Sequence, residues 1–474
     1  MSRILRQIWF GGLGAAVAAC AAVPLAASPA RSETLESALV QAYQKNPSLN
    51  SQRAATRAID EGVPQALSGY RPRIAVVGTG GEQTSSTTSK SSNFGVGTYS
   101  TIAGYNSPAQ VGATVTQTLY NGFQTANKTR QAESAVLAAR STLRVTEQTV
   151  LLAAATAYMN LLRDSAILDL QRRNVEVLQE QLRQTRDRFN VGEVTRTDVA
   201  QSESSLAAGR SQVLLAEANY TASAATYRQV IGNDPGKLTP ATPVDRFSPH
   251  DLSGAVATAS ATNPAVTAAE YNVDVALRAV KVAEGALYPT VSVQGSYTQN
   301  WLSSQSLSIM NSYNASVLGT LSMPIYQGGA EYSLIRQAKE TLGQKRLDLD
   351  TARDQIRQNV VQAWGQLEAA KANINATQAQ VQASEIALNG IREEARVGQR
   401  TTFDVLTAQQ TLVNARVALV TAQHDRVVAS YTLLSAVGRL SPQVLGLRVP
   451  AYDATVHYKQ VRDSWVGVRT PDGR

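Results

Sequence analysis

The sequence predicts a mainly α fold with a smaller membrane β-barrel part, in which one long helical hairpin is used twice. Residues 191–199 recur as residues 397–405, 206 positions later, and both copies read Val-Gly-x-x-Thr-x-x-Asp-Val. Each copy lies in a long stretch without proline, at 109–234 and 325–441. Since an interior proline costs a helix about 3 kcal/mol, these stretches permit uninterrupted helices. Four segments outside the two motifs alternate apolar and polar residues, as β-strands do.

The surroundings of the two motifs repeat as well, which indicates a duplication of the chain. Tyr120 corresponds to Tyr326 at the same offset of 206, whereas Pro72 corresponds to Pro289 at an offset of 217. The first half therefore has eleven additional residues, and they lie within residues 73–110. Because this stretch is rich in Ser, Thr and Gly, we predict that the additional residues form a surface loop.

The N-terminus predicts a secretory signal peptide over residues 1–32. Two arginines precede an apolar stretch, and small residues lead to a polar segment, which is the usual layout of such a leader. We favour cleavage after Ala30 or Ser32. The alternative is lipidation of Cys20, because Val-Ala-Ala-Cys at 17–20 resembles a lipobox.

The four alternating segments occupy equivalent positions in the two repeats. Residues 111–116, 291–300 and 315–323 alternate regularly, and residues 74–80 do so less regularly. No segment after the leader reaches the ~18 apolar residues of a transmembrane helix, so a membrane-spanning part would consist of strands. We expect their apolar face to contact lipid and their polar face to line a lumen. Four strands cannot close a barrel alone, because the smallest barrels have about eight, so closure requires several chains.

The long helices are expected to pack as coiled coils. The first, from about residue 125 to 190, would be on the order of 100 Å long. An apolar residue recurs at every seventh position, which is typical of coiled-coil packing, and we interpret these residues as helix core. The two series are Leu161, Leu168, Val175, Leu182 and Phe189, and Leu367, Ile374, Val381, Leu388 and Ala395.

Each repeated motif lies where the two helices of a hairpin meet. A glycine suits the position just after a helix, and Thr-x-x-Asp fits the capping box that begins the next one. A turn alone explains these residues. The alternative is a docking site, because the motif also holds valines at a place expected to be exposed to solvent. The candidate docking residues are Val191, Gly192, Thr195, Asp198, Val199, Val397, Gly398, Thr401, Asp404 and Val405.

Composition argues against several classes of function. The chain has 44 Lys and Arg against 36 Asp and Glu, with a net charge of +8. These charges are interspersed along the predicted helices, so we expect no nucleic-acid binding. One cysteine and three histidines provide no metal-ligand spacing. No nucleophile with a neighbouring base, glycine-rich loop or carboxylate pair stands out, so we expect neither an enzyme nor a cofactor.

These observations divide the chain into consecutive segments. Each repeat is expected to hold a helix, a pair of strands and a long helical hairpin. The segments are a signal peptide (1–32), a first repeat (33–232, with strands in 72–120 and a hairpin in 122–232), a linker (233–250), a second repeat (251–438, with strands in 289–325 and a hairpin in 329–438) and a C-terminal segment (439–474).

Over residues 33–440 the sequence resembles the TolC family of outer-membrane efflux and secretion ducts. The resemblance is carried by the duplicated tip motif, by Leu-Tyr-Asn-Gly at 119–122, by Pro-Ile-Tyr-Gln-Gly-Gly at 324–329, and by the Asn-Pro pairs that begin at Asn46 and Asn263. Residues 465–469, Trp-Val-Gly-Val-Arg, resemble the tails of alphaproteobacterial members.

This resemblance implies a homotrimer, with twelve strands forming one outer-membrane barrel that continues into an α-helical barrel in the periplasm, and an equatorial position for the linker (233–250) and the C-terminal segment (439–474). It also implies that a periplasmic adaptor (membrane fusion) protein meets the hairpin tips, and that an inner-membrane ABC or RND pump supplies the cargo. Drugs and proteins both remain possible cargo, because the pump selects it.

One feature departs from the family pattern. Members commonly carry paired acidic residues at the tunnel mouth, and the matching positions here are Asn389 and Arg392. Glu393 and Glu394 follow directly, but each residue along a helix turns by about 100°, so they point elsewhere. The candidate residues of the tunnel entrance are Asn389, Arg392 and Glu393.

We therefore expect the exit duct of a tripartite efflux pump or type I secretion system, located in the outer membrane with its helical tunnel in the periplasm. The alternative is a secreted trimeric coiled-coil adhesin or a periplasmic spacer protein. That alternative explains the leader and the heptads but not two alternating strand pairs at matching positions.

Overall fold

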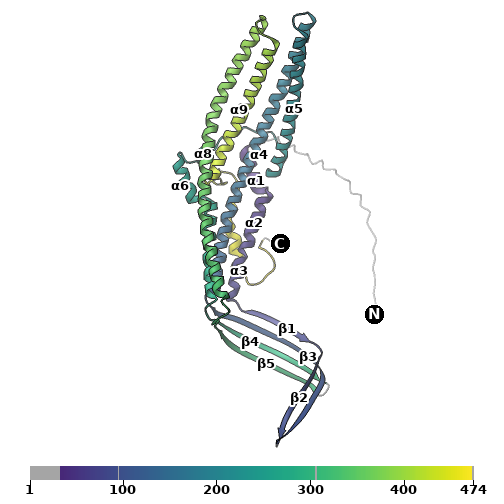
Figure 1. The fold of residues 1–474 in the computed structure, drawn as a ribbon, viewed down its shortest axis with the longest axis vertical. Coiled ribbons are helices and arrows are strands. Elements are labelled where there is room, and N and C mark those ends of the chain that lie inside the picture. The colour runs from purple at the N-terminus through teal and green to yellow at the C-terminus, as the bar shows by residue number, and fades with distance from the viewer. Residues whose placement is uncertain (1–32, 94, 305–306, 472–474) are drawn as a thin grey trace, which may run out of the picture.

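The protein is a long helical body that carries a β-sheet at one end (Figure 1). The computed structural model describes residues 33–471 apart from 94 and 305–306. The predicted signal peptide and the question of Cys20 lie outside the described residues.

Two helices of 67 residues each dominate the fold. They are α4 (Gln124–Asn190) and α8 (Ala330–Arg396), and both end at a hairpin tip far from the sheet (Figure 1). The chain then returns along α5 (Arg196–Ile231) and α9 (Thr402–Ala436), which are about half as long. The prediction of a first long helix over about 125–190 is confirmed.

Shorter helices fill the space beside the half of α4 and α8 that α5 and α9 do not reach. α7 packs against both α4 and α8, and α2 packs against α4. The shorter elements are α1 (Leu35–Lys45), α2 (Pro47–Asp60), α3 (Gly62–Leu67), η1 (Ser68–Tyr70), η2 (Asp245–Phe247), α6 (Leu252–Thr262), α7 (Pro264–Gly285) and α10 (Ala454–Val461).

The two Asn-Pro pairs have the same structural task. The Asn46 side chain accepts hydrogen bonds from the first free amides of α2, and the following proline occupies the first helical position, where it needs no amide hydrogen. The Asn46 amide also donates to the Val230 carbonyl near the end of α5, at 2.9 Å. Asn263 caps α7 in the same way and donates to the Ala436 carbonyl at the end of α9, at 3.0 Å. Each asparagine thus joins a short helix to the returning helix of its own repeat.

The sheet is antiparallel with the order β1-β3-β4-β5, and β2 pairs with β3 alone. The four expected strand segments are confirmed within β1, β3, β4 and β5, but the prediction of four strands needs correction, because a fifth strand, β2, forms in the stretch that was expected to be a loop. The described strands are β1 (Arg73–Gly80), β2 (Gln83–Asn93), β3 (Val96–Asn121), β4 (Thr290–Ser304) and β5 (Leu307–Ser322).

The strand register places apolar residues of different strands on one face of the sheet. One row across the sheet consists of Ile74, Val115, Gly295 and Val317. The adjacent row, one residue along, points to the opposite face and consists of Ala75, Thr114, Ser296 and Ser316. The hydroxyls of Ser296 and Ser316 are hydrogen bonded across the strands at 2.8 Å. The predicted alternation is confirmed for these strands.

The additional residues of the first half form a ribbon, so the prediction of a loop is wrong. β2 pairs with the start of β3 from Gln83–Asn106 to Asn93–Val96, beyond the level at which β4 ends. Ser and Thr fit this ribbon because their side chains can bond across strands, as Thr88 and Thr101 do at 2.8 Å. The polar composition that indicated a loop is equally compatible with a solvated β-hairpin.

The largest buried cluster lies in the middle of the helical body. Tyr158 and Tyr227 are fully buried there, and the Tyr158 hydroxyl donates to the Thr239 carbonyl at 2.6 Å and accepts from the Thr239 amide at 3.0 Å. The Arg426 guanidinium hydrogen bonds Asp245 in the same linker and holds the pKa of that carboxyl below its usual range. These contacts fix the linker between the repeats against α4 and α9.

Coiled-coil packing extends along most of the predicted stripe. Leu161, Leu168 and Leu182 are buried on α4, as predicted. Phe189, the last residue of the first series, is 42% exposed, so its assignment to the core is wrong. Among the described residues, no helix combines the length and the apolar character needed to cross a membrane.

Candidate functional site at the hairpin tips

The first tip closes α4 with a left-handed glycine. Gly192 has φ 82°, a conformation that glycine adopts without steric cost. The Gly192 amide donates to the Phe189 carbonyl at 3.0 Å, and the Glu193 amide donates to the Arg188 carbonyl at 2.9 Å. This pair of bonds is a Schellman motif, which satisfies carbonyls that the helix end leaves free.

The second tip repeats this arrangement. Gly398 has φ 78°, and its amide donates to the Ala395 carbonyl at 3.2 Å. The Gln399 amide donates to the Glu394 carbonyl at 2.9 Å. The predicted glycine caps are therefore confirmed in both hairpins.

A capping box begins each returning helix. The Asp198 amide donates to the Thr195 hydroxyl at 3.3 Å, and the Thr195 amide donates to the Asp198 carboxylate at 2.9 Å. Thr401 and Asp404 make the same two bonds, at 3.3 Å and 3.0 Å. Hydrogen bonds from the threonines lower the pKa of both carboxyl groups, so the carboxylates stay charged beside the positive end of the helix.

The valines of the two motifs divide into exposed and packed residues. Val191 and Val397 are 72% and 70% exposed, as expected for a surface that another protein could cover. Val405 is only 8% exposed, and Val199 packs against a cluster formed by α4, α5 and α9. The expectation that Val199 and Val405 are exposed is wrong. They lie one residue after the capping aspartate, on the side of the returning helix that faces the rest of the helical body.

A groove of about 770 Å³ lies between the two tips. Glu180 and Gln184 of α4 line it from the first hairpin, and Arg396 and Arg400 line it from the second. Several of these charges have partners in their own hairpin: Glu180 pairs with Arg183 at 2.6 Å, and Arg396 with Glu393 at 3.0 Å. The groove thus offers both signs of charge, and Val397 lies in the sequence between two of its lining residues, Arg396 and Gly398.

The three entrance candidates do not form one cluster. Asn389 is exposed, and Arg392 donates to the Gln409 side chain of α9 at 3.0 Å. Glu393 pairs with Arg396, whereas Glu394 pairs with Arg400 of the turn at 2.8 Å. The two glutamates therefore have basic partners of their own, and neither is bonded to Arg392.

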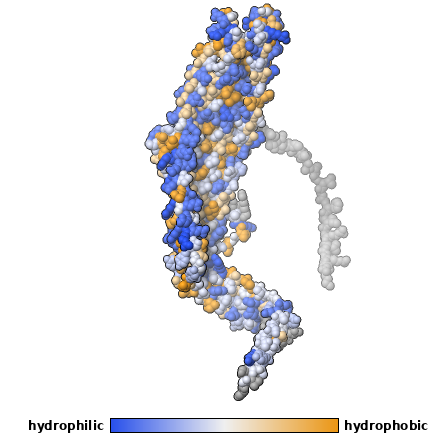
Figure 2. Space-filling view, in the orientation of Figure 1, coloured by the Kyte–Doolittle hydropathy of each residue, from blue (hydrophilic) through white to orange (hydrophobic). Residues whose placement is uncertain are grey.

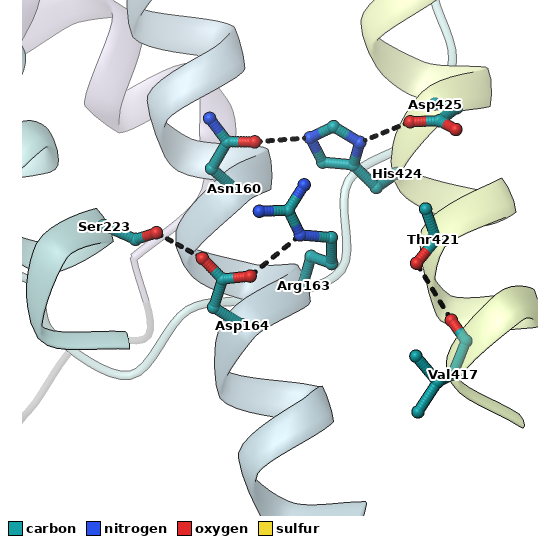
Figure 3. A network of polar contacts seen from close by, with 8 residues as sticks. All are labelled: Asn160, Arg163, Asp164, Ser223, Val417, Thr421, His424 and Asp425. Atoms are coloured by element: carbon teal, nitrogen blue, oxygen red, sulfur yellow. Dashed lines mark hydrogen bonds and ion pairs between the residues drawn. The ribbon is translucent and has the colours of Figure 1, made fainter. Parts of the chain in front are cut away.

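A partly buried polar layer crosses the helices beside the central core (Figure 3). His424 of α9 is bonded to Asn160 of α4 and to Asp425, both at 2.8 Å. One turn along α4, Asp164 accepts a hydrogen bond from Arg163 at 2.8 Å and another from Ser223 of α5. The layer connects three helices and includes both hairpins. Sequence reasoning missed it because no spacing relates residue 160 to residue 424.

Within the described residues, no group of three or more His, Cys, Asp or Glu is placed to hold a metal ion. The carboxylates of the tips already accept hydrogen bonds from caps or pair with arginines.

Comparison with known proteins gives the family. Residues 38–233 and 255–439 match the family model described as "Outer membrane efflux protein", and these two matches span most of the chain. The chain belongs to the outer membrane efflux protein family. Its helical body and sheet are therefore those of a TolC-like channel, and the duct is an outer-membrane protein. Membership of this family favours the exit duct over the alternative of a secreted adhesin or periplasmic spacer protein.

Relatives of the efflux protein cover nearly the full chain. It is 43% identical over 451 residues to the outer membrane efflux protein BepC of Brucella suis, covering 95% of both chains. It is 27% identical to the outer membrane protein TolC of Escherichia coli, covering 88% of this chain and 85% of TolC. The solved structure of the Campylobacter jejuni CmeC outer membrane channel superposes with a TM-score of 0.72 at 16% identity, covering 90% of this chain and 89% of CmeC.

Proposed function

We propose that three copies of this chain form one continuous duct, with a twelve-strand barrel in the outer membrane and a helical tunnel in the periplasm. The observation that carries the proposal is the open sheet. In the described strands, β1 and β5 each pair on one side only, and apolar rows cover one face. An unpaired edge cannot remain in lipid, because its amides and carbonyls would lack partners. Pairing β5 of one copy with β1 of the next removes these two edges.

The helices support the same assembly. Large apolar side chains are exposed along α5 and α8 at places where a neighbouring copy would cover them. They include Leu214, Leu215, Leu347, Val361 and Ile386. We propose residues 33–232 and 251–438 as the two repeats of each copy, so that three copies line the tunnel with six hairpins.

The tips face away from the membrane end and are the part that an inner-membrane system would reach. We propose that a periplasmic adaptor protein docks on Val191, Val397 and the groove between them, and that an ABC or RND pump in the inner membrane delivers drugs or proteins through it. Gly192, Thr195, Asp198, Gly398, Thr401 and Asp404 hold these valines in place. In this proposal Val199 and Val405 act through packing. Asn389, Arg392 and Glu393 remain the proposed tunnel entrance.

The docking proposal predicts that Val191→Glu combined with Val397→Glu separates assembly from transport. Both side chains are exposed, so trimer yield in the outer membrane should equal wild type. Cross-linking to the co-expressed adaptor through Glu193→Cys should be lost, because the change places a charge in an apolar contact.

The control is Gln399→Glu, which adds one negative charge in the exposed turn of the second tip without removing an apolar side chain. It should retain cross-linking. If the double variant also cross-links normally, the valines do not contact the adaptor, and the motif serves only to turn the chain.

A further inference from the structure

The C-terminal tail is fixed at the boundary between the helices and the sheet. After α10, Ser464 contacts Arg71, which lies two residues before β1. Figure 1 shows the C-terminal segment beside the lower part of the helical body. The Arg71 guanidinium donates to the Ser464 carbonyl at 2.6 Å and lies 4.7 Å from the centre of the Trp465 ring. α10 itself is held by His457, whose ring nitrogen is 3.1 Å from the buried Asp60 carboxylate.

This fixed tail presents apolar side chains to the outside. Trp465 is 67% exposed, Val466 is 89% exposed, and Val468 is fully exposed. Packing in the fold therefore does not explain these three residues. An anchored segment that leaves an indole and two valines uncovered needs a partner that takes up apolar groups.

The position of the tail indicates what that partner is. Exposed aromatic residues gather where the helices meet the sheet, and apolar residues appear at this level in Figure 2. Tyr and Trp are characteristic of the zone where membrane meets water. Since the sheet is the outer-membrane end of the duct, this level corresponds to the periplasmic surface of that membrane. The exposed aromatics at the boundary are Tyr70, Phe123, Tyr288 and Tyr326.

The charges beside the tail suit anionic headgroups. Arg71 supports the indole, Arg73 begins β1, and Arg469 follows the two valines. Basic side chains next to a membrane surface attract anionic phospholipids, and a neighbouring indole and aliphatic groups can enter the interface.

We propose that residues 465–469 are a membrane-surface anchor, in which Trp465, Val466 and Val468 enter the periplasmic leaflet of the outer membrane and Arg71 and Arg469 contact phospholipid phosphates. The proposal rests on the membrane orientation of the proposed duct. Each trimer would carry three such anchors around the base of its barrel, where they would fix its height in the bilayer.

Tryptophan fluorescence tests the anchor in the assembled protein. The chain has four tryptophans, of which Trp9 lies in the predicted signal peptide. Trp301→Phe with Trp364→Phe therefore leaves Trp465 as the reporter of the processed chain. Trimers of this variant are reconstituted into phosphatidylcholine–phosphatidylglycerol vesicles with brominated acyl chains. We expect the lipid bromines to quench Trp465, and aqueous iodide to quench it little. Strong iodide quenching would place the tail in water, and quenching by neither agent would place it under protein. Either result overturns the proposal.

Two matched reporters separate the anchor from the duct. Trp301 lies on the same face of the sheet as Val317, and Trp364 packs among helices of the body. The variant that retains only Trp301 should be quenched by brominated lipid, and the variant that retains only Trp364 should not. If Trp301 is not quenched, the sheet is not in lipid and the proposed barrel fails. If Trp301 is quenched and Trp465 is not, only the anchor fails.

A second variant examines the apolar contacts directly. Val466→Ser with Val468→Ser leaves Trp465 and Arg71 unchanged and alters exposed residues, so trimers should form normally. We expect Trp465 to lose part of its quenching by brominated lipid and to gain quenching by iodide. Unchanged quenching would show that the two valines take no part in membrane contact and would overturn their assignment to the anchor.

Discussion

Single residues of the tips show which parts of the site follow from local sequence. Gly192 and the capping pair Thr195 and Asp198 act within a few residues of chain, so their turn could be predicted without knowledge of the fold. The burial of Val405 could not be predicted in this way, because it depends on how the returning helix faces the rest of the body. The hydrogen bond between His424 and Asn160 could not be predicted for the same reason, because these two residues are far apart in the sequence.

Val405 and Val397 provide a matched pair for measuring packing at the second tip. Val405→Ala removes about two buried methylene equivalents, so the start of α9 should lose about 2 kcal/mol of local stability. Val397→Ala, at an exposed position in the same motif, should change it by less than about 0.5 kcal/mol. Amide hydrogen exchange of the first turns of α9 measures both. Equal exchange in the two variants would contradict the packed position of Val405.

Whole elements were predictable where their pattern is long. Absence of proline and a seven-residue period predict α4 and α8, and alternation predicts the two faces of β3, β4 and β5. The ribbon of β2 and β3 was missed because Ser, Thr and Gly are common both in loops and in exposed hairpins. Whether such a segment forms a loop or a hairpin depends on its pairing partner and not on its composition.

The facing of the sheet gives a prediction for one element. Val317 belongs to the apolar row, so Val317→Arg should destabilise membrane insertion by about 2 to 4 kcal/mol near the bilayer centre and reduce trimer yield. Ser316 is its neighbour on the opposite face, and Ser316→Arg should leave trimer yield near wild type. Heat-modifiable trimer bands in outer-membrane fractions measure both variants. Equal losses would contradict the assignment of the two faces.

For the whole molecule, the duplication could be predicted from the sequence, but the contacts between the two repeats of the chain could not. The central core combines Tyr158 of α4, Tyr227 of α5 and Leu434 of α9 with residues of the linker and the C-terminal segment. No sequence periodicity relates these segments, because the side chains of each segment pack into the space that the other segments leave open. The prediction of a trimer came from the resemblance to the family and not from sequence periodicity.

The proposed entrance gives a prediction for the assembled duct. Arg392→Asp reverses a charge that is present three times per trimer, and a ring of charge in a narrow pore governs which ions pass. Conductance of purified trimers in planar bilayers should shift toward cations. Arg357→Asp makes the same change on α8, about ten turns from Arg392, and should alter selectivity less. Unchanged selectivity in Arg392→Asp would show that this side chain does not face the conducting path.

The equal lengths of α4 and α8 limit how the chain can change in length. One residue inserted into either helix turns everything beyond it by about 100° and advances the tip by about 1.5 Å. Seven inserted residues would restore the buried stripe but leave one tip about 10 Å higher than the other. An insertion in one copy therefore has to be matched by an equal insertion in the other. The ribbon of β2 and the start of β3 has no such restriction, because its two strands pair only with each other. The eleven residues by which the first half of the chain exceeds the second lie in this region.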